Sequence, residues 1–113
     1  MIDTFSFGSI VIDGKKYISD LVIFPDGHVV DSWRRKSGHR LSGDDIRKLI
    51  ESEPDVIIAG TGVNGLVIPD KELEKNLSQT GIDFIYAPNQ KAIELYNDLI
   101  TKKRVDACFH LTC

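Results

Sequence analysis

The spacing of apolar positions divides the chain into a front region and a back region with different periods. In the front region, short apolar runs alternate with glycine-containing turns, a pattern typical of antiparallel strands. We predict strands over residues 7–12, 17–24 and 28–33. Asp-Gly at 13–14 and Pro-Asp-Gly at 25–27 supply the turns between them, because proline presets φ and glycine accepts a positive φ.

The back region alternates helical and strand patterns. Apolar residues at three- and four-residue spacing predict three helices, which begin near Ser42, Pro69 and Asn89. Ser42 and Asp45 suit the start of the first helix, Pro69 the first turn of the second, and Asn89 the cap of the third. The strands that follow these helices are predicted at residues 55–59, 82–86 and 105–111.

The predicted order of elements is β-β-β-α-β-α-β-α-β. Alternating strands and helices in the back region imply right-handed crossovers between parallel strands, and the front hairpins then join or pack on that sheet. We therefore expect an α/β fold, a three-layer domain with a mixed central sheet. With 113 residues and 42% apolar positions, residues 1–113 are expected to form a single globular domain that buries its own core.

Charge and length narrow the classes of function. The net charge of −3 gives no reason to expect nucleic acid or an acidic membrane as a ligand. No apolar run approaches the length of a bilayer span, and the first residues lack the pattern of a signal peptide. We therefore expect a cytoplasmic protein without membrane contact or a nucleic-acid partner.

The glycine loop, residues Gly60–Gly65, matches the spacing of the dinucleotide-binding fingerprint. In that fold the last glycine opens a helix, but here an apolar run ending in Pro69 follows, and the next strand does not end in a carboxylate. We therefore reject a dinucleotide site. Gly60, Thr61 and Gly62 remain candidates for holding a small anion through converging backbone amides at the end of a parallel strand.

The basic segment, Arg34–Arg40, carries four positive charges and a histidine within seven residues. If it lies beside the glycine loop, Arg34, Arg35 and His39 join the loop in binding phosphate or carboxylate. Otherwise the glycines only turn the chain, and the basic segment is a solvated loop or a docking site for an acidic partner. The segment holds one aromatic residue without interleaving, which disfavours nucleic acid.

Other polar residues suggest architecture rather than chemistry. Cys108, His110 and Cys113 are too few to close a structural zinc site, so we expect no metal. No set of residues forms a catalytic constellation, so we also expect no catalytic residue and no cofactor. Tyr96 and Asn97 border the buried stripe of the last predicted helix, where we expect them to serve the structure through hydrogen bonding. Asp20, in an apolar strand, either pairs with the basic segment or faces solvent.

Several stretches of the sequence resemble one family nearly from end to end. They are FGSIVIDGKKYISDLVIFPDG at 7–27, Trp33-Arg34-Arg35 with Gly38-His39, IIAGTG at 57–62, Ala92, Tyr96-Asn97, Leu99, and RVDACFHLTC at 104–113. The family includes the adipogenesis-associated domain protein of animals and a mitochondrial assembly factor for respiratory complex I, and the ending resembles its archaeal or bacterial branch. The resemblance implies a compact three-layer domain with a mixed sheet. It implies no reaction or cofactor, because the better-understood eukaryotic members act through protein partners.

Three hypotheses for function follow. The first is a non-enzymatic binding or assembly module that docks a protein partner, with residues 33–40 as the contact surface. The second is a small-molecule anion-binding protein or an enzyme, with its site at the glycine loop and the basic segment. The third is a homo-oligomer in which sheet edges or helices pair two copies of the chain.

Overall fold

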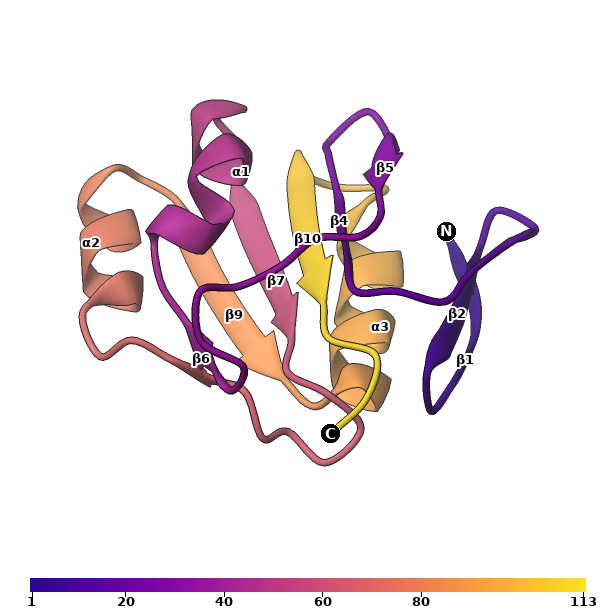
Figure 1. Cartoon of the computed structure of the whole chain (residues 1–113). Coiled ribbons are helices and arrows are strands. Elements are labelled where there is room, and N and C mark those ends of the chain that lie inside the picture. Colours follow the sequence, from indigo (N-terminus) through magenta and orange to yellow (C-terminus); the bar gives the residue numbers. More distant parts are fainter.

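The computed structural model describes all 113 residues and is built on a five-stranded mixed sheet of order β5-β4-β10-β7-β9 (Figure 1). β10 (Val105–Phe109) lies at its centre, parallel to β7 (Val56–Gly60), and β7 is parallel to β9 (Asp83–Ala87). On the other side, β4 (Leu21–Ile23) is antiparallel to β10, and β5 (Val29–Val30) is antiparallel to β4. The predicted α/β fold with a mixed central sheet is therefore confirmed.

Helices cover both faces of this sheet (Figure 1). One face carries α3 (Asn89–Leu99), and the other carries the 3-10 turn η1 (Asp44–Ile46), α1 (Arg47–Glu51) and α2 (Leu73–Gln79). All five residues of β7 and of β10 are buried, as expected for strands covered on both sides. No helix in the structure has the length and apolar character needed to cross a membrane.

The front of the chain forms a second, three-stranded antiparallel sheet beside α3. Its strands are β1 (Ile2–Ser6), β2 (Ser9–Ile12) and β3 (Lys15–Tyr17). The predicted strand over 17–24 is therefore wrong, since the chain leaves this sheet after Tyr17 and enters the central sheet at Leu21. The break contains Asp20, whose side chain accepts a hydrogen bond from the Leu111 amide instead of standing in a strand.

Two other predicted boundaries differ from the structure. Pro69 does not open a helix but lies in β8 (Ile68–Pro69), which pairs in parallel with β6 (Arg40–Leu41). The flanking amides of Ile68 and Asp70 donate to β6 or its neighbour, so proline, which lacks an N–H group, costs no hydrogen bond there. The strand predicted over 28–33 is reduced to β5.

The first predicted helix opens with the 3-10 turn η1, and its α-helical part begins only at Arg47, but Ser42 and Asp45 form hydrogen bonds at its start as predicted. The Asp45 amide donates to the Ser42 hydroxyl at 3.3 Å, and the Ser42 amide donates to the Asp45 carboxylate at 2.9 Å. Such a reciprocal pair satisfies two amides that the helix start leaves without backbone partners. It also fixes Asp45, whose carbonyl accepts a hydrogen bond from the Trp33 indole described below.

Candidate functional site

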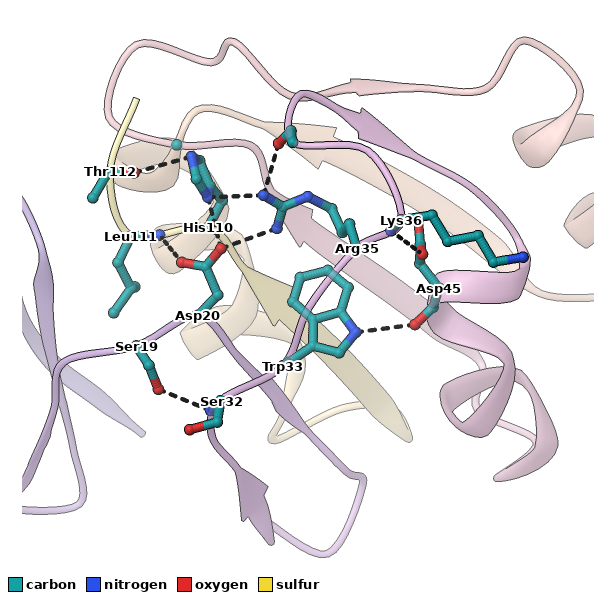
Figure 2. Close-up of polar contacts among 12 residues, drawn as sticks. Ser19, Asp20, Ser32, Trp33, Arg35, Lys36, Asp45, His110, Leu111 and Thr112 are labelled. Carbon is teal, nitrogen blue, oxygen red and sulfur yellow. Dashed lines mark hydrogen bonds and ion pairs between the residues drawn. The ribbon is translucent and has the colours of Figure 1, made fainter.

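Four side chains from distant parts of the sequence form the histidine cluster, Asp20, Arg35, His110 and Thr112 (Figure 2). His110 follows β10, and Asp20 precedes β4. The Asp20 carboxylate lies 3.0 Å from an Arg35 guanidinium nitrogen and 2.7 Å from Nδ1 of His110. The cluster therefore sits at the carboxyl end of a central parallel strand, where open α/β sheets commonly place ligands.

The Asp20 carboxylate is held in its charged form. Burial alone would raise the pKa of Asp20, but hydrogen bonds from His110, the Leu111 amide and Arg35 outweigh that effect and lower the pKa below its usual value. Both carboxylate oxygens are engaged, since the Leu111 amide donates to Oδ1 and the other two groups contact Oδ2.

The contact with Asp20 determines which nitrogen of His110 carries a proton. Only an Nδ1–H group can donate to the ionised Asp20 carboxylate, so the neutral ring has Nε2 as its acceptor. Nε2 lies 3.1 Å from Oγ1 of Thr112, whose hydroxyl can donate to it. The Arg35 nitrogen 3.1 Å from Nδ1 is then a close neighbour and not a hydrogen-bond donor to the ring.

The glycine loop lies directly beside the histidine cluster. The His110 amide donates to the Gly60 carbonyl at 3.0 Å. Buried Asn89, the first residue of α3, bridges the two, because its amide nitrogen donates to the His110 carbonyl at 2.6 Å and its oxygen accepts from the Gly62 amide at 3.1 Å. The sequence predicted that Asn89 caps the third helix. Its side chain instead joins the ends of two strands.

The amides of the glycine loop already have acceptors within the chain. The Val63 amide donates to the Thr112 carbonyl at 2.7 Å, and the amides of Asn64 and Leu66 both donate to the Cys113 oxygen at 3.2 Å. The Gly62 amide donates to the side-chain oxygen of Asn89, and the amide of buried Thr61 donates to the backbone carbonyl of Ala87 in β9. The loop therefore holds residues 112–113 in place with the groups that the sequence assigned to an anion.

The structure separates the candidate residues of the basic segment. Arg35 belongs to the histidine cluster, with a side chain only 6% exposed. The His39 ring lies edge-on to the His110 ring, with 6.4 Å between the ring centroids. The backbone carbonyl of His39 accepts a hydrogen bond from the Ile68 amide. Arg34 is exposed and lies instead on a groove on the α1 face of the sheet. Thus Arg35 and His39 lie near the glycine loop, and Arg34 does not join them.

The groove has a volume of about 920 Å³ and lies between the β4–β5 hairpin and the η1–α1 segment. Val22, Ile46 and Leu49 give it an apolar floor, and Trp33 forms part of its wall. Five basic side chains and four aspartates line it: Arg34, Lys36, Arg47, Lys48 and Arg104, with Asp26, Asp31, Asp44 and Asp45.

The charges of the groove are only partly paired. Asp44 lies 2.7 Å from Lys36 and 3.8 Å from Arg47, and the Asp45 carboxylate accepts from backbone amides. Arg34 and Lys48 have no ion-pair partner. Asp26 and Asp31 have no ion-pair partner either. The groove therefore presents unpaired charge of both signs, with five basic side chains against four aspartates, on a chain that is negative overall.

Trp33 connects the groove to the histidine cluster (Figure 2). Its indole nitrogen donates to the Asp45 carbonyl at 3.0 Å, which fixes the ring against η1. The Arg35 guanidinium carbon lies 5.2 Å from the centre of its ring, within the range of a cation–π contact.

Asp106 is a buried carboxyl group that the sequence analysis missed. It is 0% exposed, and the only hydrogen bond of its side chain comes from the Ser52 hydroxyl, which donates at 2.7 Å. Its other oxygen, Oδ1, has no partner. Burial raises the pKa of Asp106 to about 6, and the Ser52 hydrogen bond and the Arg104 charge offset only part of that effect. An aspartate inside the apolar run 105–111 is the signal that could have identified it.

Asp106→Asn is expected to raise the free energy of unfolding by about 2–3 kcal/mol at about pH 8, because burying the carboxylate costs about 1.4 kcal/mol per unit of pKa shift. Below pH 3.8 both states hold the proton, and between 3.8 and about 6 only the folded state does. Stability of the native protein therefore falls as pH rises through that window. Urea unfolding at several pH values tests this, with exposed Asp83→Asn as the control that leaves the slope unchanged. An equal slope in Asp106→Asn would contradict the prediction.

The remaining candidate residues, Asn97, Tyr96 and Cys108, have structural positions in the fold. The Asn97 side chain donates to the carbonyl of Ile2 at 2.9 Å and accepts from its amide at 2.8 Å, which joins α3 to β1. Tyr96 is buried in the core beneath α3, and burial raises its pKa to about 12. Cys108 is buried on the opposite face, and burial raises its pKa to about 12 as well, which disfavours a reactive thiolate.

Comparisons with known proteins place the chain in a family. PH1505 from Pyrococcus horikoshii OT3 shares 29% identity over 100% of this chain and 99% of its own, with a TM-score of 0.88. The structure of MT938 shares 32% identity over 100% and 98%, with a TM-score of 0.84. XCC1710 from Xanthomonas campestris has the same fold at 20% identity over 98% and 83%, with a TM-score of 0.81. A family model described as a protein of unknown function, DUF498/DUF598, matches residues 2–110. The chain therefore belongs to the DUF498/DUF598 family of proteins of unknown function.

Proposed function

We propose that the chain is a binding module that docks an acidic segment of a protein partner in the groove. The observation that carries this proposal is the groove itself, about 920 Å³ in volume, with an apolar floor and a lining in which basic side chains outnumber aspartates by five to four. Apolar area supplies affinity, and charge complementarity supplies the rate and the specificity of docking. An extended segment that alternates acidic and apolar side chains fits both features.

The position of Trp33 supports this proposal. Aromatic residues and arginine are the side chains most enriched at the centres of protein interfaces, and Trp33 and Arg34 are consecutive in the groove. Trp33 is also fixed by its hydrogen bond to the Asp45 carbonyl. A preorganised side chain loses little conformational freedom on binding, which favours affinity.

The resemblance to family members that act through protein partners supports the same proposal. The adipogenesis-associated domain protein and the complex I assembly factor are eukaryotic proteins of this kind, and we propose a comparable partner-dependent role here. In this proposal residues 1–113 act as one domain in the cytosol, without a cofactor or a nucleic-acid partner.

Fluorescence of Trp33, the only tryptophan in the chain, offers a direct test. The probe is a synthetic ten-residue peptide of alternating glutamate and leucine, titrated at low salt. We expect saturable binding that weakens at least tenfold when Arg34 and Lys48 are both changed to Glu, because each rim charge that turns repulsive costs about 1 kcal/mol. Binding should also weaken as salt is added.

The matched control changes Lys16 and Lys91 to Glu. Both lysines are exposed and lie on β3 and α3, away from the groove, and the double variant has the same net charge as the groove variant. An equal loss of affinity in the two double variants would show that the peptide responds to overall charge, and the groove would lose its role. The absence of any saturable signal would remove the proposal too.

A further inference from the structure

We propose that the histidine cluster is a second site, in which His110 activates the hydroxyl of Thr112 as a nucleophile toward activated acyl esters. Asp20 is the positioning residue that holds the imidazole. This inference is independent of the groove and of the partner proposed for it.

The geometry supplies a complete relay from carboxylate to hydroxyl. Asp20 holds Nδ1 of His110 at 2.7 Å, and Nε2 on the far side of the ring lies 3.1 Å from Oγ1 of Thr112. A nucleophile within hydrogen-bond reach of a base, which is itself oriented by a third group, is the arrangement that activates serine or threonine hydroxyls. The Leu111 amide and Arg35 also bind Asp20, so the carboxylate cannot turn away from the ring.

The hydroxyl of Thr112 differs from two other threonine hydroxyls that bond within the chain. Those of Thr80 and Thr101 contact carbonyl oxygens three residues earlier, at 2.8 Å and 3.3 Å, as hydroxyls near helix ends often do. A carbonyl oxygen can accept the hydrogen bond but cannot remove the proton. Thr112 faces an imidazole nitrogen instead, and an imidazole nitrogen is a base that can accept the proton.

The cluster is both rigid and reachable. The Thr112 carbonyl accepts from the Val63 amide at 2.7 Å, so the glycine loop fixes the backbone while the side chain stays partly exposed. The His110 side chain is 12% exposed, and the exposed His39 ring stands at its edge. A small ester can therefore reach Oγ1 of Thr112 without unfolding the segment.

The reaction balances with groups present in the cluster and water. Nε2 of His110 takes the hydroxyl proton as Oγ1 forms a bond to the acyl carbon, and the ester's alkoxide leaves with that proton as an alcohol. Water then attacks the acyl group, gives a proton to Nε2, and breaks the bond to Oγ1. The free acid leaves, and the proton returns to Thr112. Asp20 stays ionised throughout and only orients the ring.

The test uses p-nitrophenyl acetate as the acyl donor and peptide mass spectrometry to locate acetyl groups. We expect acetylation of Thr112 in the full chain, none at this position in Thr112→Val, and a loss of about 100-fold in rate in His110→Gln, the range for removal of a general base. Thr112→Ser, with a less hindered primary hydroxyl, should react faster than the native protein. Thr101→Val is the control that leaves the rate unchanged.

A structural role for the cluster predicts a different set of results. If His110 and Thr112 only hold the chain end, Thr112 will carry no more acetyl than Thr101, or His110→Gln will react as fast as the native protein. Either outcome overturns the proposal, provided that Trp33 fluorescence shows the variants to be folded. Asp20→Asn adds a readout that mere packing would not move, since loss of the carboxylate should change the pH profile of acetylation along with its rate.

Discussion

Gly62→Ala is expected to lower the free energy of unfolding by more than about 3 kcal/mol. Gly62 has a φ of +109°, a region that residues with a side chain rarely adopt. A Cβ atom there would overlap the backbone carbon of Cys113 and lie 2.6 Å from its oxygen. Because the obstacles are backbone atoms held by the amides of the glycine loop, they cannot give way as a flexible side chain would.

Urea unfolding followed by Trp33 fluorescence measures this effect. Gly38→Ala is the matched control, because Gly38 lies in open space with an ordinary φ, and it should change stability by less than about 0.5 kcal/mol. Equal stabilities for the two variants would contradict the packing described for the loop. The result also bears on ligand assays, since a Gly62 variant that binds nothing will have lost its fold before it has lost a site.

Arg35→Gln is expected to lower the free energy of unfolding by about 3–5 kcal/mol, the cost of removing one partner from a buried ion pair. The Arg35 side chain is 6% exposed, and its loss would leave the partly buried Asp20 carboxylate beside His110 without its cation. It would also remove the hydrogen bond to the Gly38 carbonyl and the contact with the Trp33 ring. Arg34→Gln, one position earlier but exposed and unpaired, should cost less than about 0.5 kcal/mol.

The dependence of the free energy of unfolding on acidic pH gives a second measurement of the Asp20–Arg35 ion pair. The pKa of Asp20 is lowered by folding, so its stabilisation is present above the unfolded value of 3.8 and is lost as pH falls through the lower folded pKa. Removing Arg35 removes one cause of that lowering, so in Arg35→Gln the loss should be smaller and should be complete at a higher pH. Unfolding at a series of acidic pH values checks this. Parallel profiles for Arg34→Gln and Arg35→Gln would contradict the pairing.

The local sequence pattern was sufficient to predict the central strands of the sheet, but it was insufficient to predict where the N-terminal strands begin and end. The patterns at 55–59 and 105–111 each predicted a strand, and the apolar run at 55–59 is typical of a strand covered on both faces. The structure has β7 and β10 there, with every residue buried. The stretch 17–24 was predicted as one strand although Ser19 and Asp20 interrupt its apolar residues, and it is shared by two sheets. Its break is set by a contact between Asp20 and Leu111, 91 residues away, which no local period records.

Pro69 shows how two valid local rules can compete. Proline suits the first turn of a helix, but it also suits a short strand in which its nitrogen faces away from the partner. Pairing with Arg40–Leu41 decided between them, and that pairing depends on where the chain after Leu41 is placed. The second helix therefore starts at Leu73, four residues later than predicted from Pro69.

The candidate site was harder to predict than the fold, because adjacent residues of the same type point to different parts of the structure and the contacting residues are far apart in the sequence. Arg34 and Arg35 are equivalent in sequence, but only Arg35 lies in the histidine cluster. Asp20 and His110 are 90 residues apart, so each looked isolated. Asn89 looked like a helix cap and instead links the glycine loop to the end of β10.

The place of β10 in the sheet has a consequence for how the protein is made. β10 follows every other strand in the chain, yet it fills the centre of the sheet between β4 and β7. During synthesis, the edges of β4 and β7 stay open until β10 has left the ribosome, and open strand edges are sites of aggregation. Completion of the sheet also waits for contacts between distant parts of the chain, which slows folding. A nascent chain stalled before Val105 should therefore depend on chaperones far more than the released protein does.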